Sequence, residues 1–122
     1  MGTFAVTAGK TGIRFDLKAG NGEIIASSEA YSSTAACRKG IESVRRNAAE
    51  ANLEDQTEEG FSKVTHPKFE LYRDNAGEFR FRLKATNGQV IATSEGYVAK
   101  KSCENGIESV KKNAVDAPVV EE

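Results

Sequence analysis

The chain offers few residues that could do chemistry. It has one histidine, His66, and two cysteines, Cys37 and Cys103, among 122 residues. A lone histidine cannot assemble a metal site, so we expect His66 to lie in a solvated loop. The sequence also lacks a phosphate-binding loop, a nucleophile elbow, a Cys-x-x-Cys pair and a His-Glu-x-x-His motif. We therefore expect no enzyme activity, no cofactor and no metal.

The most suggestive polar motif is Ser-Glu-x-Tyr, which occurs at residues 28–31 and again at residues 94–97. A structural role accounts for it best. In this interpretation Glu95 pairs with Arg80 on the neighbouring strand, and Tyr97 covers the edge of the core. The same roles fall to Glu29 and Tyr31 in the first occurrence.

The charge distribution gives the best indication of a binding function. The net charge of the chain is −1. Residues 49–60 hold five of the 18 acids, and residues 115–122 hold three. The rest of the chain therefore carries 17 bases and ten acids, a net charge of +7. A basic body of this kind could hold a polyanion. The alternative is ordinary solubilising charge, because the bases alternate with acids. The candidate binding residues are Arg80, Arg82, Lys84, Lys100 and Lys101, with Tyr72 as a stacking ring.

These residues belong to a duplicated unit. Shifted by 66 positions, residues 14–48 match residues 80–114 at 20 of 35 positions. Such identity indicates an internal repeat. The two cysteines are therefore one structural position seen twice. We assign residues 1–56 to repeat 1, residues 57–66 to an acidic linker and residues 67–122 to repeat 2.

Three strands begin each repeat. In repeat 2, apolar residues alternate with polar ones over residues 69–72 and 79–84, and a third strand covers residues 89–95. Asn87-Gly88 predicts a two-residue type I′ hairpin loop, since both residues tolerate positive φ. That loop would place Lys84 opposite Ile91 and Leu83 opposite Ala92. Arg80, Arg82 and Lys84 then share the polar outer face of the sheet.

One helix follows the strands in each repeat, because apolar residues recur at helical spacing. Its buried stripe includes a glycine in both copies, which indicates that another part of the fold lies close against the helix. The cysteines on this stripe are expected to act as small hydrophobic residues rather than as redox groups. The stripe residues are Cys37, Gly40, Ile41, Val44 and Ala48, and Cys103, Gly106, Ile107, Val110 and Ala114.

Two segments, FELYRDNAGEFRFRLKATNGQVIATSEGY (69–97) and NGIESVKKNA (105–114), resemble the YegP-like family of small bacterial proteins of unknown function. The resemblance covers nearly all of the chain. It implies β(3)-α-β units that pair, as tandem repeats or as two subunits, in one continuous sheet with exchanged C-terminal strands. The family supplies no catalytic or ligand-binding residues that could be transferred to this sequence.

The sequence thus predicts an α+β protein with two tandem β(3)-α-β repeats. They form one antiparallel sheet with helices on one face and pseudo-twofold symmetry. We expect a structural or protein-interaction module, or else a weak binder of nucleic acid or an anionic ligand through the outer face of repeat 2. The N-terminal residues do not show the basic-then-apolar pattern of a signal peptide, and no stretch approaches the roughly 20 apolar residues that a membrane helix needs. We therefore expect a cytoplasmic monomer whose repeats pair within the chain, with an unknown protein partner.

Overall fold

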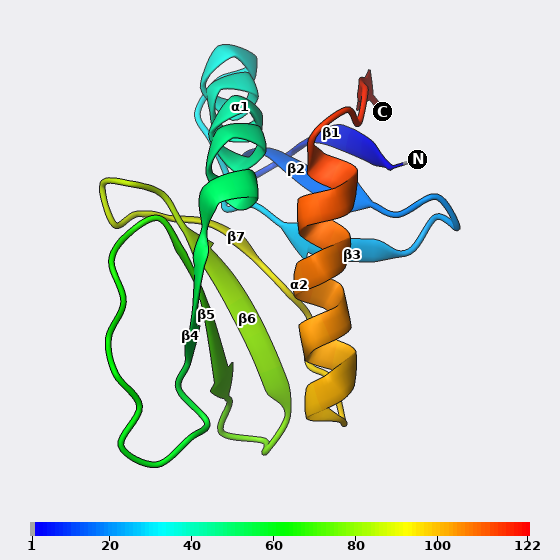
Figure 1. Cartoon of the computed structure of the whole chain (residues 1–122). Helices are drawn as coiled ribbons and strands as arrows, with labels where there is room; N and C mark the ends of the chain where they lie inside the picture. Colours follow the sequence, from blue (N-terminus) through cyan, green and yellow to red (C-terminus); the bar gives the residue numbers. More distant parts are fainter. Residues whose placement is uncertain (1) are drawn as a thin grey trace.

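Two helices lie on one face of a single eight-stranded sheet in the computed structural model, which describes residues 2–122 (Figure 1). The prediction of two β(3)-α-β repeats is confirmed. Repeat 1 contributes β1 (Thr3–Gly9), β2 (Gly12–Lys18), β3 (Ile24–Ser27), α1 (Thr34–Glu50) and β4 (Asn52–Asp55). Repeat 2 contributes β5 (Lys68–Arg73), β6 (Phe79–Lys84), β7 (Val90–Thr93), α2 (Lys100–Ala114) and β8 (Val119–Glu121).

Each repeat gives its last strand to the other half of the sheet. The strand order is β4-β5-β6-β7-β3-β2-β1-β8, so β4 of repeat 1 pairs with β5 of repeat 2, and β8 pairs with β1. Both of these outer pairings are parallel, whereas the six inner strands are antiparallel. The sheet is therefore mixed rather than wholly antiparallel as predicted. The difference arises because β4 and β8 return across the sheet after a helix, which allows them to run alongside the first strand of the other repeat.

The exchange gives the two halves one shared core with matching contacts. Phe4 meets Phe15 edge to face at 5.7 Å between ring centroids, and Phe69 meets Phe81 in the same way at 5.8 Å. In both pairs one ring comes from the first strand of the repeat and the other from the second. The predicted helix stripes are buried against these rings.

The hairpin before β7 is longer by one loop residue than predicted. Gly88 is the only residue of the Asn87-Gly88 pair with positive φ, at 84°. Its N–H donates to the carbonyl of Ala85 at 2.8 Å, and the Ala85 N–H donates to the carbonyl of Gln89 at 2.9 Å. This is a three-residue loop ending in a left-handed glycine, not the predicted type I′ loop.

The longer loop changes the register at the end of the hairpin. Leu83 still faces Ala92 as predicted, but Lys84 faces Val90, and Ile91 is the extra residue of a bulge. The predicted pairing of Lys84 with Ile91 is therefore wrong. Lys84 nevertheless stays on the outer face, because the bulge lies on β7 and leaves the alternation along β6 intact.

The glycine on each helix stripe faces the tyrosine of the Ser-Glu-x-Tyr motif. A Cβ atom at Gly106 would lie 2.6 Å from the Tyr97 hydroxyl and 3.0 Å from Cε2 of Phe81. Tyr31 and Phe15 crowd Gly40 in the same way. The expected close approach to the helix is thus present in both repeats, and a tyrosine ring makes it. No side chain larger than hydrogen fits there without displacing that ring.

Candidate functional site

The three predicted cations of β6 lie on the outer face of the sheet, and each is paired with an acid. Arg80 Nε lies 2.6 Å from Asp74 Oδ2, rather than pairing with Glu95 as predicted. The turn before β6 explains the difference, since it brings Asp74 back toward the strand. Arg82 Nε donates to Glu70 Oε1, and Lys84 Nζ lies 3.2 Å from Glu70 Oε2. Arg82 and Lys84 share Glu70, which also pairs with Lys68, so the charge of the three cations is offset in part within the protein.

The remaining predicted site residues are spread over different parts of the surface. The Arg82 guanidinium lies 4.4 Å from the ring centroid of Tyr72, so this face of the ring is covered by the protein itself. Lys100 Nζ lies 2.7 Å from Asp55 Oδ2 and 3.0 Å from Glu58 Oε1, both in or beside the acidic linker. Lys101 is exposed at the start of α2. The structure does not bring these residues together with Arg80 as one open basic face.

A buried charge network, which sequence reasoning missed, lies on this face beneath the linker. Glu54, Lys68 and Glu70 are 2%, 5% and 3% exposed. Lys68 Nζ lies 2.7 Å from Glu54 Oε2 and 3.1 Å from Glu70 Oε2. The Val64 N–H also donates to Glu54 Oε2 at 2.9 Å, which fastens the linker to the sheet. We call Glu54, Lys68 and Glu70 the buried triad.

The internal repeat contained a signal for the buried triad. The structurally equivalent positions at the other end of the sheet hold Val120, Ala5 and Thr3, which are uncharged. The paired strands β4 and β5 therefore carry three charged residues where β8 and β1 carry uncharged ones. The sequence comparison could reveal that difference only once β4 was known to pair with β5.

The electrostatics of the buried triad favour its charged form. Burial opposes ionisation of Glu54, but hydrogen bonds from Lys68, Gln56 and the Val64 N–H outweigh it and lower its pKa to about 2. Burial also opposes ionisation of Glu70, and Arg82, Lys68 and Lys84 together lower the pKa of that carboxyl. Each charge of the triad therefore has a partner of opposite sign within 3.1 Å.

Acid is expected to weaken the fold through Glu54. Its folded pKa is about 2, below the ordinary value of 4.5, so its stabilising effect is complete above pH about 4.5. That effect is lost as the pH falls from about 4.5 toward 2, at a cost of about 2 to 3 kcal/mol. Urea unfolding as a function of pH measures the loss. Glu54→Gln should show a shallower decline over this range, and an equal decline in both proteins would contradict the assignment.

The two cysteines lie in the core, and the histidine lies at the surface. Both thiols are fully buried, and burial raises the pKa of Cys37. Burial and the charge of Glu104 raise the pKa of Cys103 to about 11. His66 is exposed beside Pro67. Among residues 2–122, no three His, Cys, Asp or Glu side chains gather as metal ligands. None of the helices in this part of the chain is long and apolar enough to cross a membrane.

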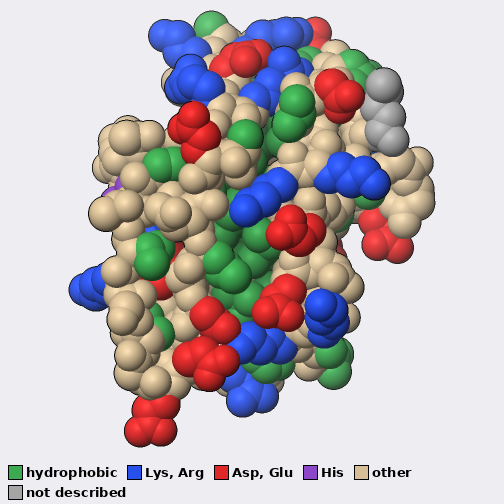
Figure 2. Space-filling view, viewed as in Figure 1, with side chains coloured by type: hydrophobic (Ala, Val, Ile, Leu, Met, Phe, Trp, Pro, Cys, Tyr) green, Lys and Arg blue, Asp and Glu red, His purple; other side chains and the backbone are tan. Residues whose placement is uncertain are grey.

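The helix side of the molecule carries a different feature, an open groove of about 300 Å³ between β4 and α2. Figure 2 shows hydrophobic side chains gathered in this region with charged groups around them. Leu53, 47% exposed, and Ile107 form the apolar part of the groove. Its charged rim consists of Lys101, Glu104, Glu108 and Lys111. We call this the β4–α2 groove.

The equivalent place in repeat 1 is bridged. Arg38 of α1 reaches Glu121 of β8, with 3.4 Å between Nη2 and Oε1. The residues that correspond to Arg38 and Glu121 are Glu104 of α2 and Asp55 of β4, two acids that cannot pair with each other. Lys100, one turn before Glu104, pairs with Asp55 instead, so an ion pair joins the helix to the edge strand in both places but starts from a different helix position.

The fold and these surfaces define a class of protein: a tandem β(3)-α-β repeat with exchanged edge strands and two unequal faces. The family model "Domain of unknown function (DUF1508)" matches residues 10–55 and 74–121. The chain belongs to this family, which is also called UPF0339 and includes YegP, so the resemblance expected from the sequence is confirmed.

Three relatives show what the chain is similar to. The UPF0339 protein in the ptx operon 5′ region of Stutzerimonas stutzeri is 40% identical over 121 residues, covering 98% of this chain and 96% of that one. The solution structure of YegP from E. coli is 36% identical and has a TM-score of 0.79, covering 99% of this chain and 92% of that one. A Treponema denticola relative is 63% identical over 54 residues, which are 44% of this chain but 93% of that protein. The last is therefore about one repeat long.

Proposed function

We propose that the protein is a non-catalytic protein-interaction module and that its contact surface is the β4–α2 groove. The observation that carries the proposal is Leu53, a large apolar side chain left 47% exposed next to Ile107 in an open groove. Covering apolar surface of this kind is favourable, at about 25 cal/mol per Å². An apolar centre with a charged rim is also the usual arrangement of protein interfaces.

The open edge of β4 adds hydrogen-bonding groups to the same surface. The strand is the last in the sheet, with β5 as its only neighbour. The Asn52 and Gln56 N–H groups donate to carbonyls on the β5 side, so the alternating N–H groups of Leu53 and Asp55 point away from the sheet. An extended partner segment could pair with this edge while placing an apolar side chain beside Leu53.

Leu53→Glu is expected to weaken partner binding strongly, because it places a charge in the apolar part of the groove at a side chain that is only half-buried. The control is Val98→Glu, since Val98 is 88% exposed and does not line the groove. Tagged wild-type protein and both variants would be used for affinity capture from the source cells. Wild type and Val98→Glu should capture the partner equally, and Leu53→Glu should capture at least about tenfold less of it. Calorimetry would then measure direct binding of that partner.

Failure of that comparison has a clear meaning. If no protein distinguishes Leu53→Glu from Val98→Glu, the groove is not the contact surface and the proposal is wrong. Thermal unfolding of the two variants would be compared first, so that loss of binding is not confused with loss of structure.

The alternative function, weak binding of nucleic acid or an anionic ligand through Arg80, Arg82 and Lys84, has less support. Each of these side chains already has a carboxylate partner, and Arg82 covers Tyr72. A polyanion would have to displace those partners, one of which, Glu70, is only 3% exposed. The acidic linker also lies over part of this face through the Val64 contact with Glu54.

A further inference from the structure

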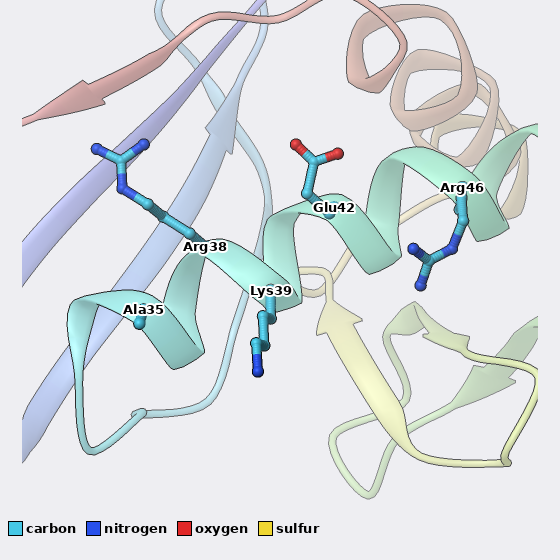
Figure 3. A pocket seen from close by; sticks show the side chains of 5 residues that line it. All are labelled: Ala35, Arg38, Lys39, Glu42 and Arg46. Atoms are coloured by element: carbon cyan, nitrogen blue, oxygen red, sulfur yellow. The ribbon is translucent and has the colours of Figure 1, made fainter.

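In the part of the chain that the structure describes, the solvent face of α1 carries two cations without an acidic partner and a third whose partner is exposed. Lys39 and Arg46 form no ion pair among residues 2–122. Arg38, on the same helix, is bound only to the exposed Glu121 of the C-terminal segment at 3.4 Å. These three cations line one shallow depression of about 380 Å³ together with Ala35 and Glu42 (Figure 3).

The positions of the side chains suit a ligand that lies along the helix. Lys39 and Arg46 are seven residues apart, which is about two turns and about 10.5 Å of rise. Figure 3 shows both projecting from the same side of α1, away from the Arg38 side chain. Arg46 also lines a second depression of about 210 Å³, where Ser43, Thr86 and Asn87 supply hydroxyl and amide groups. Its guanidinium thus lies between two hollows on one surface.

The second helix provides a comparison within the same molecule. The face of α1 formed by Ala35, Arg38, Lys39, Glu42 and Arg46 has three cations and one acid, a net charge of +2. The equivalent residues of α2 are Lys101, Glu104, Asn105, Glu108 and Lys112, two cations and two acids with a net charge of zero. The two helices share a fold and a core but differ in this surface charge. General features of the repeat therefore do not account for the cations of α1.

We infer that the solvent face of α1 binds a chain of phosphates through Lys39, Arg46 and Arg38. Arginine and lysine both recognise phosphate oxygens, arginine with two parallel hydrogen bonds and lysine as a point charge. A linear polyanion can occupy both hollows along the helix, whereas a single small anion fills only one. Neither hollow is lined by an aromatic residue. The contacts would therefore be made to phosphates and would be independent of base sequence.

The test uses fluorescence anisotropy of a labelled thymidylate single strand of about 20 nucleotides at about 50 mM salt. Lys39→Ala/Arg46→Ala is compared with Lys101→Ala/Lys112→Ala, which removes the same charge from α2. Lys112 is equivalent to Arg46, and Lys101 lies one turn before the equivalent of Lys39. The first pair should weaken binding at least about tenfold and lower the salt slope by about 1.4, twice the single-strand value of 0.7 per phosphate contact. The second pair should bind as wild type does.

A third variant tests the role of Arg38 in the opposite direction. Glu121→Gln removes its partner and should strengthen binding, because the guanidinium becomes free to contact phosphate. Competition experiments then distinguish a nucleic acid from inorganic polyphosphate as the ligand. Whichever of the two displaces the labelled strand at the lower concentration of phosphate groups is the preferred ligand. Equal loss of binding in both double variants, equal competition by poly-glutamate, or no binding of either phosphate chain at tens of micromolar protein would overturn the inference.

Discussion

Replacing Lys68 with methionine is expected to lower the free energy of unfolding by about 3 to 5 kcal/mol. The Lys68 ammonium lies between Glu54 and Glu70, which face each other directly on neighbouring parallel strands. Without it, the almost fully buried Glu54 carboxylate would have no cationic partner and would face Glu70, which keeps Arg82 and Lys84 as partners. Methionine keeps most of the volume of lysine, so the loss reports the charge. Urea unfolding at neutral pH measures it.

A double-mutant cycle separates this electrostatic effect from packing. Glu54→Gln/Lys68→Met should be more stable than Lys68→Met alone, because the double variant no longer buries the unpaired Glu54 carboxylate. Lys101→Met, on the exposed start of α2, should change stability by less than about 0.5 kcal/mol. Simple additivity in the cycle would show that Lys68 contributes through packing and not through the buried triad.

Residues 67–122 expressed alone are expected not to form a stable monomer. In this fragment β5 loses its partner β4 and β8 loses its partner β1, so both edge pairings of the repeat disappear. A unit of this size also has too little buried surface to be comfortably stable by itself. The fragment can recover both pairings by exchanging β8 between two copies. We therefore expect an unfolded monomer at low concentration and a strand-exchanged homodimer at high concentration.

Sedimentation and thermal unfolding over a range of concentrations check this result. The unfolding temperature of the fragment should rise with concentration, whereas that of the full chain, which we expect to be a monomer, should not. The Treponema relative, about one repeat long, would serve as a naturally short comparison. A fragment that is monomeric and as stable as the full chain would refute the argument.

The sequence predicted the strands and helices because each has a clear period. Alternation around Phe81 and Leu83 marked β6, and the spacing of Cys103, Ile107 and Val110 marked α2. The exchange of β4 and β8 could not be obtained from those periods. A strand of three or four residues has too few positions to show which partner it pairs with, and the exchange was implied only by the family resemblance.

The candidate sites were harder to predict, because ion pairs depend on contacts between distant segments. Arg80 could be placed on the outer face from its alternation, but its partner Asp74 depends on the path of a turn. In the sequence, Glu54 is one of five acids in residues 49–60. Only its position beside β5 makes it part of the buried triad. Outside residues 49–60 and 115–122, the sequence carries a net charge of +7. In the structure, however, acids from those two segments form ion pairs with several of these bases.

The exchange of β4 and β8 also bears on how the two halves of the molecule came to differ. A dimer of identical subunits shows every surface twice, because each substitution appears on both sides of its axis. Joining two non-identical copies in one chain ensures that each molecule contains one of each, held together at an effective concentration in the millimolar range. Arg38 in one half and Glu104 in the other can then evolve separately. A single inherited core thus supports two surfaces that are free to acquire different partners.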